Sequence, residues 1–160
     1  MQPLTIRNAG ATDERHLVGL ASRMANFPLP PWRTADEIMS ADARAMLDAV
    51  RGGDPDSEVF VAERDGEIAG CLHVMVAADF FGRRHAHLSV ISTTAAAEGT
   101  GVGRALMAFA DGWARARRLP FITLNVFAAN ARARRLYQRS GYDIELLKYA
   151  KSLEEDRSEG

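Results

Sequence analysis

The sequence has very little cysteine. Cys71 is the only one among 160 residues, so no disulfide can form within the chain. Nor is there a Cys-x-x-Cys pair, or a group of His and Cys residues at the spacing of metal ligands. We therefore expect no structural zinc site and no bound metal.

Long apolar runs are missing as well. The longest mostly apolar stretch, Ile68 to Phe81, is interrupted by His73 and Asp79 and is too short to cross a bilayer. The N-terminus leads directly into Leu4–Arg7, which resembles a strand and not a signal peptide. We expect a cytoplasmic protein with no membrane partner.

The chain also lacks an excess of charge of one sign. Its formal net charge is −1, which argues against DNA or RNA as a partner. Charge is nevertheless uneven, because residues 98–142 hold eight arginines against Glu98 and Asp111. This local surplus favours a polyanionic ligand over a neutral one.

Size and composition predict a single domain. A hydrophobic content of 47% and a charged content of 26% are ordinary for a globular protein, and 160 residues suffice for one core. We assign residues 1–153 to this domain. Residues 154–160 are polar and acidic, and we expect them to form a disordered tail.

Hydrophobic periodicity and turn residues predict alternating helices and strands. The expected helices begin near Asp13, run from Thr34 to Gly52, from Gly103 to Arg117, and from Ala131 to Ser140. The expected strands are Leu4–Arg7, Val59–Glu63, Glu67–Val76, His85–Thr94, Phe121–Val126 and Tyr142–Tyr149. This order predicts a mixed α+β fold, antiparallel at the Asp65-Gly66 hairpin and parallel across the third helix.

A glycine-rich loop separates the fourth expected strand from the third helix. Its sequence is Glu98-Gly-Thr-Gly-Val-Gly-Arg104. Glycines allow close approach of a ligand to the backbone, and the N-terminus of the helix favours an anion such as a phosphate. On these residues alone, a plain turn remains equally open.

Two motifs in the right order resemble the GNAT superfamily of acyl-CoA-dependent N-acetyltransferases. Residues 98–103 resemble that family's Q/R-x-x-G-x-G/A loop. Residues 130–142 match its N-x-x-A-x-x-L-Y…G-F/Y segment at Asn130, Ala133, Leu136, Tyr137, Gly141 and Tyr142. The resemblance covers residues 4–150 and implies a mostly antiparallel sheet flanked by four helices, with a splayed parallel pair formed by the fourth and fifth strands.

The resemblance also implies how acetyl-CoA is held. The open edge of the fourth strand would pair with the pantetheine arm through Ile91, Ser92 and Thr93. Asn130 would hold the cofactor arm with its side chain. The pyrophosphate would bind the amides of Gly99, Thr100, Gly101, Val102, Gly103 and Arg104.

By the same resemblance, Tyr137 would be the general acid that protonates the departing thiolate, close to the bound cofactor. His87 is the candidate base, since a histidine on this strand serves that role in arylalkylamine acetyltransferases. His85 lies on the same strand face, and His73 is a weaker candidate. Family members often need no dedicated base.

Two positions depart from the family pattern. Glu98 replaces the usual Arg or Gln and would repel the pyrophosphate, so we expect it to turn outward, with partial compensation by Arg104. Asn125 stands where peptide N-terminal acetyltransferases have a Glu. Asparagine cannot accept the proton, which argues against acetylation of ribosomal proteins.

The acceptor would be chosen by residues 26–33 and 77–84, as the resemblance implies. Phe27, Trp32, Phe80 and Phe81 would form an aromatic wall, and Asp79 would hold a cation. Such a site favours an amine with an apolar body, in a small molecule or a peptide.

Several alternatives stay open at this stage. The chain could use a longer acyl-CoA, or be a non-catalytic acyl-CoA sensor or interaction module. A P-loop or Rossmann nucleotide site is excluded, because no Gly-Lys-Ser/Thr follows the loop and the loop comes after the fourth strand. Many relatives dimerise, so a homodimer is the assembly that the resemblance suggests.

Overall fold

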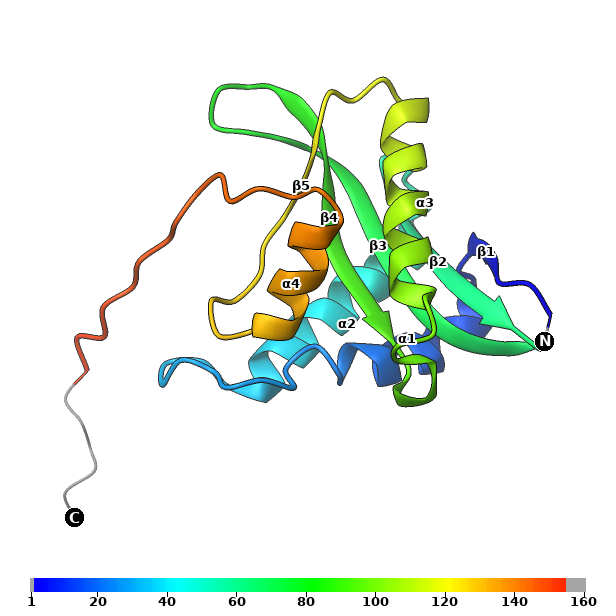
Figure 1. The fold of residues 1–160 in the computed structure, drawn as a ribbon, viewed down its shortest axis with the longest axis horizontal. Helices are drawn as coiled ribbons and strands as arrows, with labels where there is room; N and C mark the ends of the chain where they lie inside the picture. The colour runs from blue at the N-terminus through cyan, green and yellow to red at the C-terminus, as the bar shows by residue number, and fades with distance from the viewer. Residues whose placement is uncertain (1, 155–160) are drawn as a thin grey trace, which may run out of the picture.

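The computed structural model describes residues 2–154, which form one sheet with helices on both faces (Figure 1). The sheet order is β1-β2-β3-β4-β5, antiparallel except for the parallel pair β4 and β5. Its strands are β1 (Thr5–Asn8), β2 (Ser57–Arg64), β3 (Glu67–Ala78), β4 (Arg84–Thr93) and β5 (Ile122–Leu124). The helices are α1 (Glu14–Ala21), α2 (Ala35–Gly52), α3 (Val102–Ala116) and α4 (Ala131–Arg139), with short 3₁₀ turns at Ala11–Asp13 and Ala95–Ala97. The expected mixed α+β architecture is confirmed.

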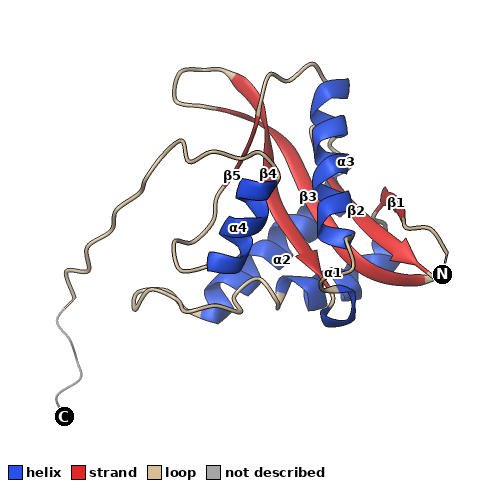
Figure 2. Ribbon diagram, viewed as in Figure 1, coloured by secondary structure: helices blue, strands red, loops and turns tan. Residues whose placement is uncertain are grey.

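Each face of the sheet has its own apolar core (Figure 2). Helix α3 packs on β3 and β4 and shares a cluster with Phe60, Leu72 and Leu88. Helices α1 and α2 cover the opposite face around Leu17 and Met46, two side chains with no exposed surface. The alternation along β2 and β3 divides these sets, since neighbouring residues of a strand point to opposite faces.

Turn and cap residues lie at the ends of the helices and strands. Thr34 and Glu37 form the capping box that begins α2. The β2–β3 hairpin turns at Asp65 and Gly66 with φ of 54° and 79°. Gly141 follows α4 with φ of 89°. These local sequences determine where the elements begin and end.

A bulge in β4 changes which residues face each core. The register with β3 shifts so that Ser89 has no partner there. Before the bulge, Leu88 lies in the cluster under α3; after it, Val90 lies in the cluster under α1 and α2, and Ile91 packs toward α3. Period-two reading of the sequence across Ser89 therefore assigns the wrong face.

Gly70 allows β3, β4 and α3 to pack closely. A Cβ at this position would lie 2.7 Å from the Ser92 carbonyl oxygen and 3.1 to 3.2 Å from the side chains of Leu106 and Val102. Only glycine leaves room for this backbone contact.

The prediction of a final strand at Tyr142–Tyr149 is wrong. Beyond Tyr142 the chain leaves the body of the molecule and forms no ladder (Figure 1). Its apolar residues favour a strand, but a strand needs a neighbouring strand, and no segment of the described chain lies beside it. The fifth strand is also shorter than expected, and residues 155–160 of the expected tail lie outside the described residues. No helix within residues 2–154 has the length and apolar character of a membrane span.

Candidate active site

The glycine loop uses glycine for backbone conformation. Gly99 and Gly101 adopt φ of 72° and 88°, and Gly101 is the N-cap of α3. No heavy atom lies within 4 Å of a Cβ built on either glycine, so the surface above the loop is open. A side chain here would strain the backbone and occupy that open surface.

The loop presents a row of free backbone donors. Within residues 2–154, the following amides donate no hydrogen bond to the protein: Gly99, Gly101, Val102, Gly103 and Arg104. The amide of Thr100 differs, because it donates to the Ala97 carbonyl at 3.2 Å. Helix α3 adds the positive end of its dipole at this place. The arrangement suits an anion with several oxygens, such as a pyrophosphate.

Strand β4 has an open edge next to this loop. Its pairing with β5 ends at Leu88 and Leu124. The Thr94 amide donates to the Ala69 carbonyl on β3. Since hydrogen-bonded and free residues alternate along an antiparallel pair, the backbone groups of Thr93 and Ile91 point away from β3, toward the unpaired side of β4. Ser92 points its carbonyl toward β3 instead. Ile91 and Thr93 therefore offer backbone groups to a ligand at this edge, and Ser92 does not.

Arginines surround Glu98 at the start of the loop. Arg23, just beyond α1, pairs with the Glu98 carboxylate, and a guanidinium nitrogen of Arg132 on α4 forms a salt bridge with the same oxygen at 3.0 Å. Arg23 also donates from Nε to the Thr93 carbonyl at 2.7 Å. Glu98 is exposed, as expected, but Arg23 and Arg132 neutralise it, and no ion pair of Arg104 occurs within the described chain.

Helix α4 carries Asn130 at its N-cap and Tyr137 near its end, and it meets β4 close to Gly103. The Asn130 side-chain oxygen accepts the Ala133 amide at 3.2 Å and so caps the helix, which leaves its NH₂ group available. Leu136 and Thr93 both lie 3.9 Å from a Cβ built on Gly103, so α4, β4 and the loop meet there. Burial raises the pKa of Tyr137 above its ordinary value, so the phenol keeps its proton at neutral pH.

The histidines share one face of the sheet. His87 Nδ1 lies 2.8 Å from the Thr123 hydroxyl on β5, and burial, with a smaller contribution from His85, lowers its pKa. His85 stacks on Phe121 with ring centroids 4.9 Å apart and is buried. His73 is 1% exposed and lies 3.0 Å from the Ser57 hydroxyl. Of these side chains, only His87 is partly exposed, and its lowered pKa keeps it neutral near pH 7.

Comparison with known proteins agrees with this geometry. The sequence profile of the acetyltransferase (GNAT) family matches residues 21–142, most of the described chain. The chain belongs to the GNAT family. The match includes β4, the glycine loop, α3 and α4.

Individual relatives of this GNAT protein are moderately similar. A mycothiol acetyltransferase of Acidothermus cellulolyticus is 37% identical over 100 residues, which cover 56% of this chain and 30% of that protein. The chain thus spans about a third of that relative's length. A transcriptional regulator from Bacillus halodurans shares 25% identity at a TM-score of 0.69, over 93% of this chain and 100% of the other. A putative acetyl transferase from Pyrococcus furiosus has a TM-score of 0.72 at 23% identity, over 94% and 100% of the two chains, and shows the fold.

The predicted acceptor residues of this GNAT chain do not come together. Phe27 lies on the connection between α1 and α2, with its ring tilted against that of Phe127 at 5.4 Å between centroids, whereas Phe80 is 97% exposed at the hairpin before β4. In Figure 1 this connection and this hairpin lie at opposite ends of β4. The ten residues of β4 separate these two places by roughly 30 Å. Asp79 accepts the amides of Phe81 and Arg83 and so holds the hairpin turn. Trp32 is 42% exposed on the loop before α2.

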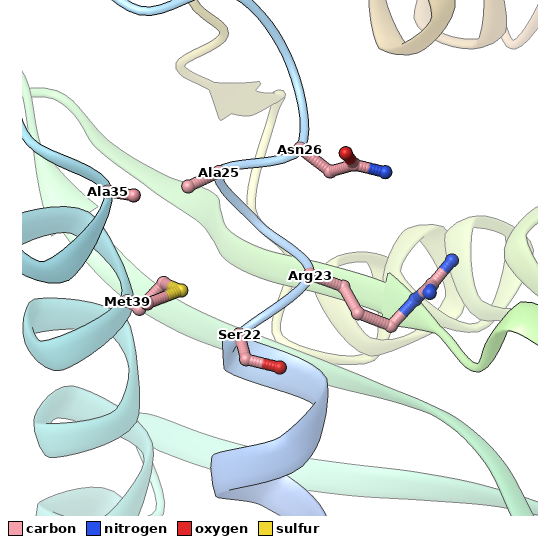
Figure 3. A pocket seen from close by; sticks show the side chains of 6 residues that line it. All are labelled: Ser22, Arg23, Ala25, Asn26, Ala35 and Met39. Carbon is pink, nitrogen blue, oxygen red and sulfur yellow. The ribbon is translucent and has the colours of Figure 1, made fainter.

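A cavity of about 280 Å³ lies between the end of α1 and the start of α2 (Figure 3). Its lining residues are Ser22, Arg23, Ala25, Asn26, Ala35 and Met39. Arg23 and Asn26 extend in the same direction, away from α2. Since Arg23 also contacts Thr93, this cavity adjoins the open edge of β4.

Sequence reasoning missed Arg23 and Thr123. Arg23 follows the apolar face of α1, and nothing in its neighbours indicates that it reaches the end of β4. Thr123 meets His87 only through the parallel register of β4 and β5. Both contacts arise from strand register and helix placement, which no local motif encodes. Among residues 2–154, no group of His, Cys, Asp or Glu side chains is arranged to hold a metal.

Proposed function

We propose that this protein is an acetyl-CoA-dependent N-acetyltransferase that acts on a primary amine of a small molecule or a peptide. The observation that carries the proposal is the row of free amides at the start of α3, next to the open edge of β4. These two features suit the two parts of CoA, an anionic pyrophosphate and an amide-containing pantetheine arm.

The cofactor would lie between β4 and β5, beyond Leu88 and Leu124, where the pairing of these strands ends. The amides of Gly99, Gly101, Val102, Gly103 and Arg104 would bind the pyrophosphate oxygens, with Thr100 contributing only after its amide is released. The backbone of Ile91 and the amide of Thr93 would pair with the pantetheine amides, since Arg23 already occupies the Thr93 carbonyl. The Asn130 NH₂ group would donate to the same arm.

Acetyl transfer needs an acid and a path for the amine proton. The acceptor nitrogen attacks the thioester carbonyl, the C–N bond forms and the C–S bond breaks. The Tyr137 hydroxyl gives its proton to the departing sulfur, which its raised pKa and its place on α4 support. His87, neutral at pH 7, would take the proton of the amine through water.

The acceptor would enter at the side of the cavity beside Arg23 and Asn26, because this cavity adjoins the open edge of β4. Phe27 and Trp32 lie on the same connection between α1 and α2 and would contact the apolar part of the amine. Asp79 and Phe80, at the far hairpin, would reach an acceptor only if it is as long as a peptide.

Thiol release from acetyl-CoA in the presence of an amine panel tests the proposal. We expect turnover with at least one amine, and a fall in kcat of about 100-fold in Tyr137→Phe with KM for acetyl-CoA unchanged. Tyr149→Phe is the matched control, since Tyr149 is 89% exposed. Full activity in Tyr137→Phe would remove the acid from the mechanism. CoA binding without turnover on any amine would favour a non-catalytic acyl-CoA sensor.

A further inference from the structure

Lysine is almost absent from this chain. Of its 20 basic side chains, two are lysine, Lys148 and Lys151, and the others are arginine. The difference matters for a protein that would transfer acetyl groups to amines. A guanidinium stays protonated in proteins and offers no nucleophilic nitrogen, whereas a lysine side chain is a primary amine. Lys148 and Lys151 therefore carry all the side-chain amines that such an enzyme would meet on its own chain.

Both lysines lie on the segment that follows α4. We call residues 143–154 the C-terminal segment. Lys148 and Lys151 are exposed, and neither forms an ion pair within residues 2–154. No hydrogen bond joins the segment to the rest of the described chain. No contact of this kind therefore fixes the path of the segment beyond its first residue.

The C-terminal segment begins beside Tyr137, the acid of the proposed reaction. The Tyr142 amide donates to the Tyr137 carbonyl at 3.0 Å, and the rings of these two residues lie 6.0 Å apart. The Tyr142 hydroxyl is buried as well, so this residue is fixed against the body of the molecule. The segment is thus tethered at a point close to Tyr137.

The tether is long enough for both lysines to return to this point. Lys148 and Lys151 lie six and nine residues beyond Tyr142, which corresponds to about 20 Å and about 30 Å of fully extended chain. In Figure 1 the segment leads away from the sheet, but a turn within it would bring either amine back to Tyr137. A short tether of this kind holds a reacting group at a millimolar effective concentration.

We infer that Lys148 and Lys151 are sites of self-acetylation, modified by the molecule that carries them. This inference rests on the proposed function. The neutral Nζ of the lysine attacks the thioester carbonyl carbon of acetyl-CoA, the C–N bond forms and the C–S bond breaks. The amine proton passes through water to His87, and the Tyr137 hydroxyl gives its proton to the departing sulfur. The products are an acetylated lysine without its positive charge and free CoA.

Mass spectrometry of the intact protein and of its peptides tests the inference. After incubation with acetyl-CoA and no added amine, we expect acetyl groups on Lys148 and Lys151, with one CoA thiol released for each. Lys148 should react about 2-fold faster than Lys151, because the effective concentration of a tethered group falls as the tether lengthens. An added amine that the enzyme acetylates should slow both modifications, since it competes for the same site.

Variants separate self-acetylation from other routes. The double variant Lys148→Arg, Lys151→Arg keeps both positive charges and should gain no side-chain acetyl group, while its turnover of free amines stays unchanged. Tyr137→Phe should modify its own lysines about 100-fold more slowly than the wild type. When the two variants are mixed, the Tyr137→Phe protein should gain acetyl groups no faster than it does alone, because the active molecule would have to modify another chain.

Four results would overturn the inference. Turnover of free amines with unmodified Lys148 and Lys151 would do so and leave the proposed function standing. Equal labelling of the wild type and Tyr137→Phe would show that acetyl-CoA reacts with the lysines unaided. Transfer from the double variant to Tyr137→Phe in the mixture would place the reaction between molecules. Absence of both labelling and turnover would remove the proposed function together with the inference.

Discussion

A single carboxylate lies between two guanidinium groups at the start of the glycine loop. Glu98 binds Arg23 from the end of α1 and Arg132 from α4, and so joins three segments that are far apart in the sequence. It also places negative charge beside the amides that would receive a pyrophosphate. The ion pairs hold the segments together, while the charge would weaken the attraction of the loop for a pyrophosphate.

Glu98→Gln should therefore bind CoA about 3- to 10-fold more tightly, because the arginines would be free to attract the phosphates. Calorimetric titration at low and high salt measures the change, and the gain should shrink as salt rises. Glu67→Gln, at the start of β3, is the control for the loss of one exposed charge. Weaker binding in Glu98→Gln would show that the ion pairs matter more than the repulsion.

His73 makes stability depend on pH. Burial, with a smaller effect of His87, lowers its pKa to about 4 from 6.5. Between these values the unfolded chain binds a proton that the folded chain does not, so stability is complete above 6.5 and falls as the pH drops toward 4. The loss reaches about 3 kcal/mol at full extent.

Urea unfolding at about pH 7.5 and about pH 5 measures this effect. The wild-type protein should lose about 2 kcal/mol more than His73→Leu between these conditions. His16→Gln, at an exposed position of α1, should behave like the wild type. An equal loss in His73→Leu and wild type would show that His73 is charged in the folded protein at pH 5.

At the scale of elements, the loop before α3 allows the effect of backbone strain on stability to be distinguished from the effect of a blocked site on ligand affinity. Gly101→Val forces a β-branched residue to a φ of 88° and places its side chain in the open space above the amides. We expect CoA affinity to fall by about 10- to 100-fold, as charge-assisted hydrogen bonds are lost. Titration with CoA measures the affinity, and thermal unfolding measures the stability.

Gly82→Val is the matched control, because Gly82 has a φ of 80° and no heavy atom within 4 Å of its Cβ site, at the hairpin far from the loop. Both variants should lose a similar amount of stability, of order 1–3 kcal/mol. If Gly82→Val lost CoA affinity to the same degree, strain alone would account for the effect.

Local sequence predicted the elements well and their contacts less well. The helix start at Thr34 and the hairpin turn at Asp65-Gly66 depend on nearest neighbours and are confirmed. The glycine loop and α4 carry motifs, and the structure brings them together. The partner of Glu98, by contrast, lies 75 residues away in Arg23. The prediction of the last strand was wrong because a strand must pair with a neighbouring strand, and its own sequence does not specify that neighbour.

At the scale of the whole molecule, burial is unequal. The buried residues of the two clusters lie on strands β2 to β4 and helices α1, α2 and α3, whereas no residue from 115 to 154 is buried. The proposed cofactor site lies along the border between these parts. A bound CoA would therefore pack against β5 and α4 and stabilise both.

CoA binding should slow hydrogen exchange in residues 122–141 by about 10-fold or more and leave β2 and β3 unchanged. The reason is that β5 and α4 open locally in the free protein, and the cofactor binds only their closed arrangement. Exchange followed by mass spectrometry, with and without a saturating amount of CoA, measures the difference. Uniform slowing across the chain would indicate that the ligand stabilises global folding instead.

The bulge at Ser89 has a consequence for how this gene tolerates length changes. Removing that one codon would abolish the bulge and leave Val90 opposite His73 and Ile91 opposite Leu72, because Ser89 is the residue that has no partner on β3. Val90 would stay on the α1 side, and the backbone groups of Ile91 and Thr93 would still point away from β3. Substitutions along β4 alter one contact each, whereas a single in-frame deletion at Ser89 would straighten the strand and keep its ligand-facing edge in place.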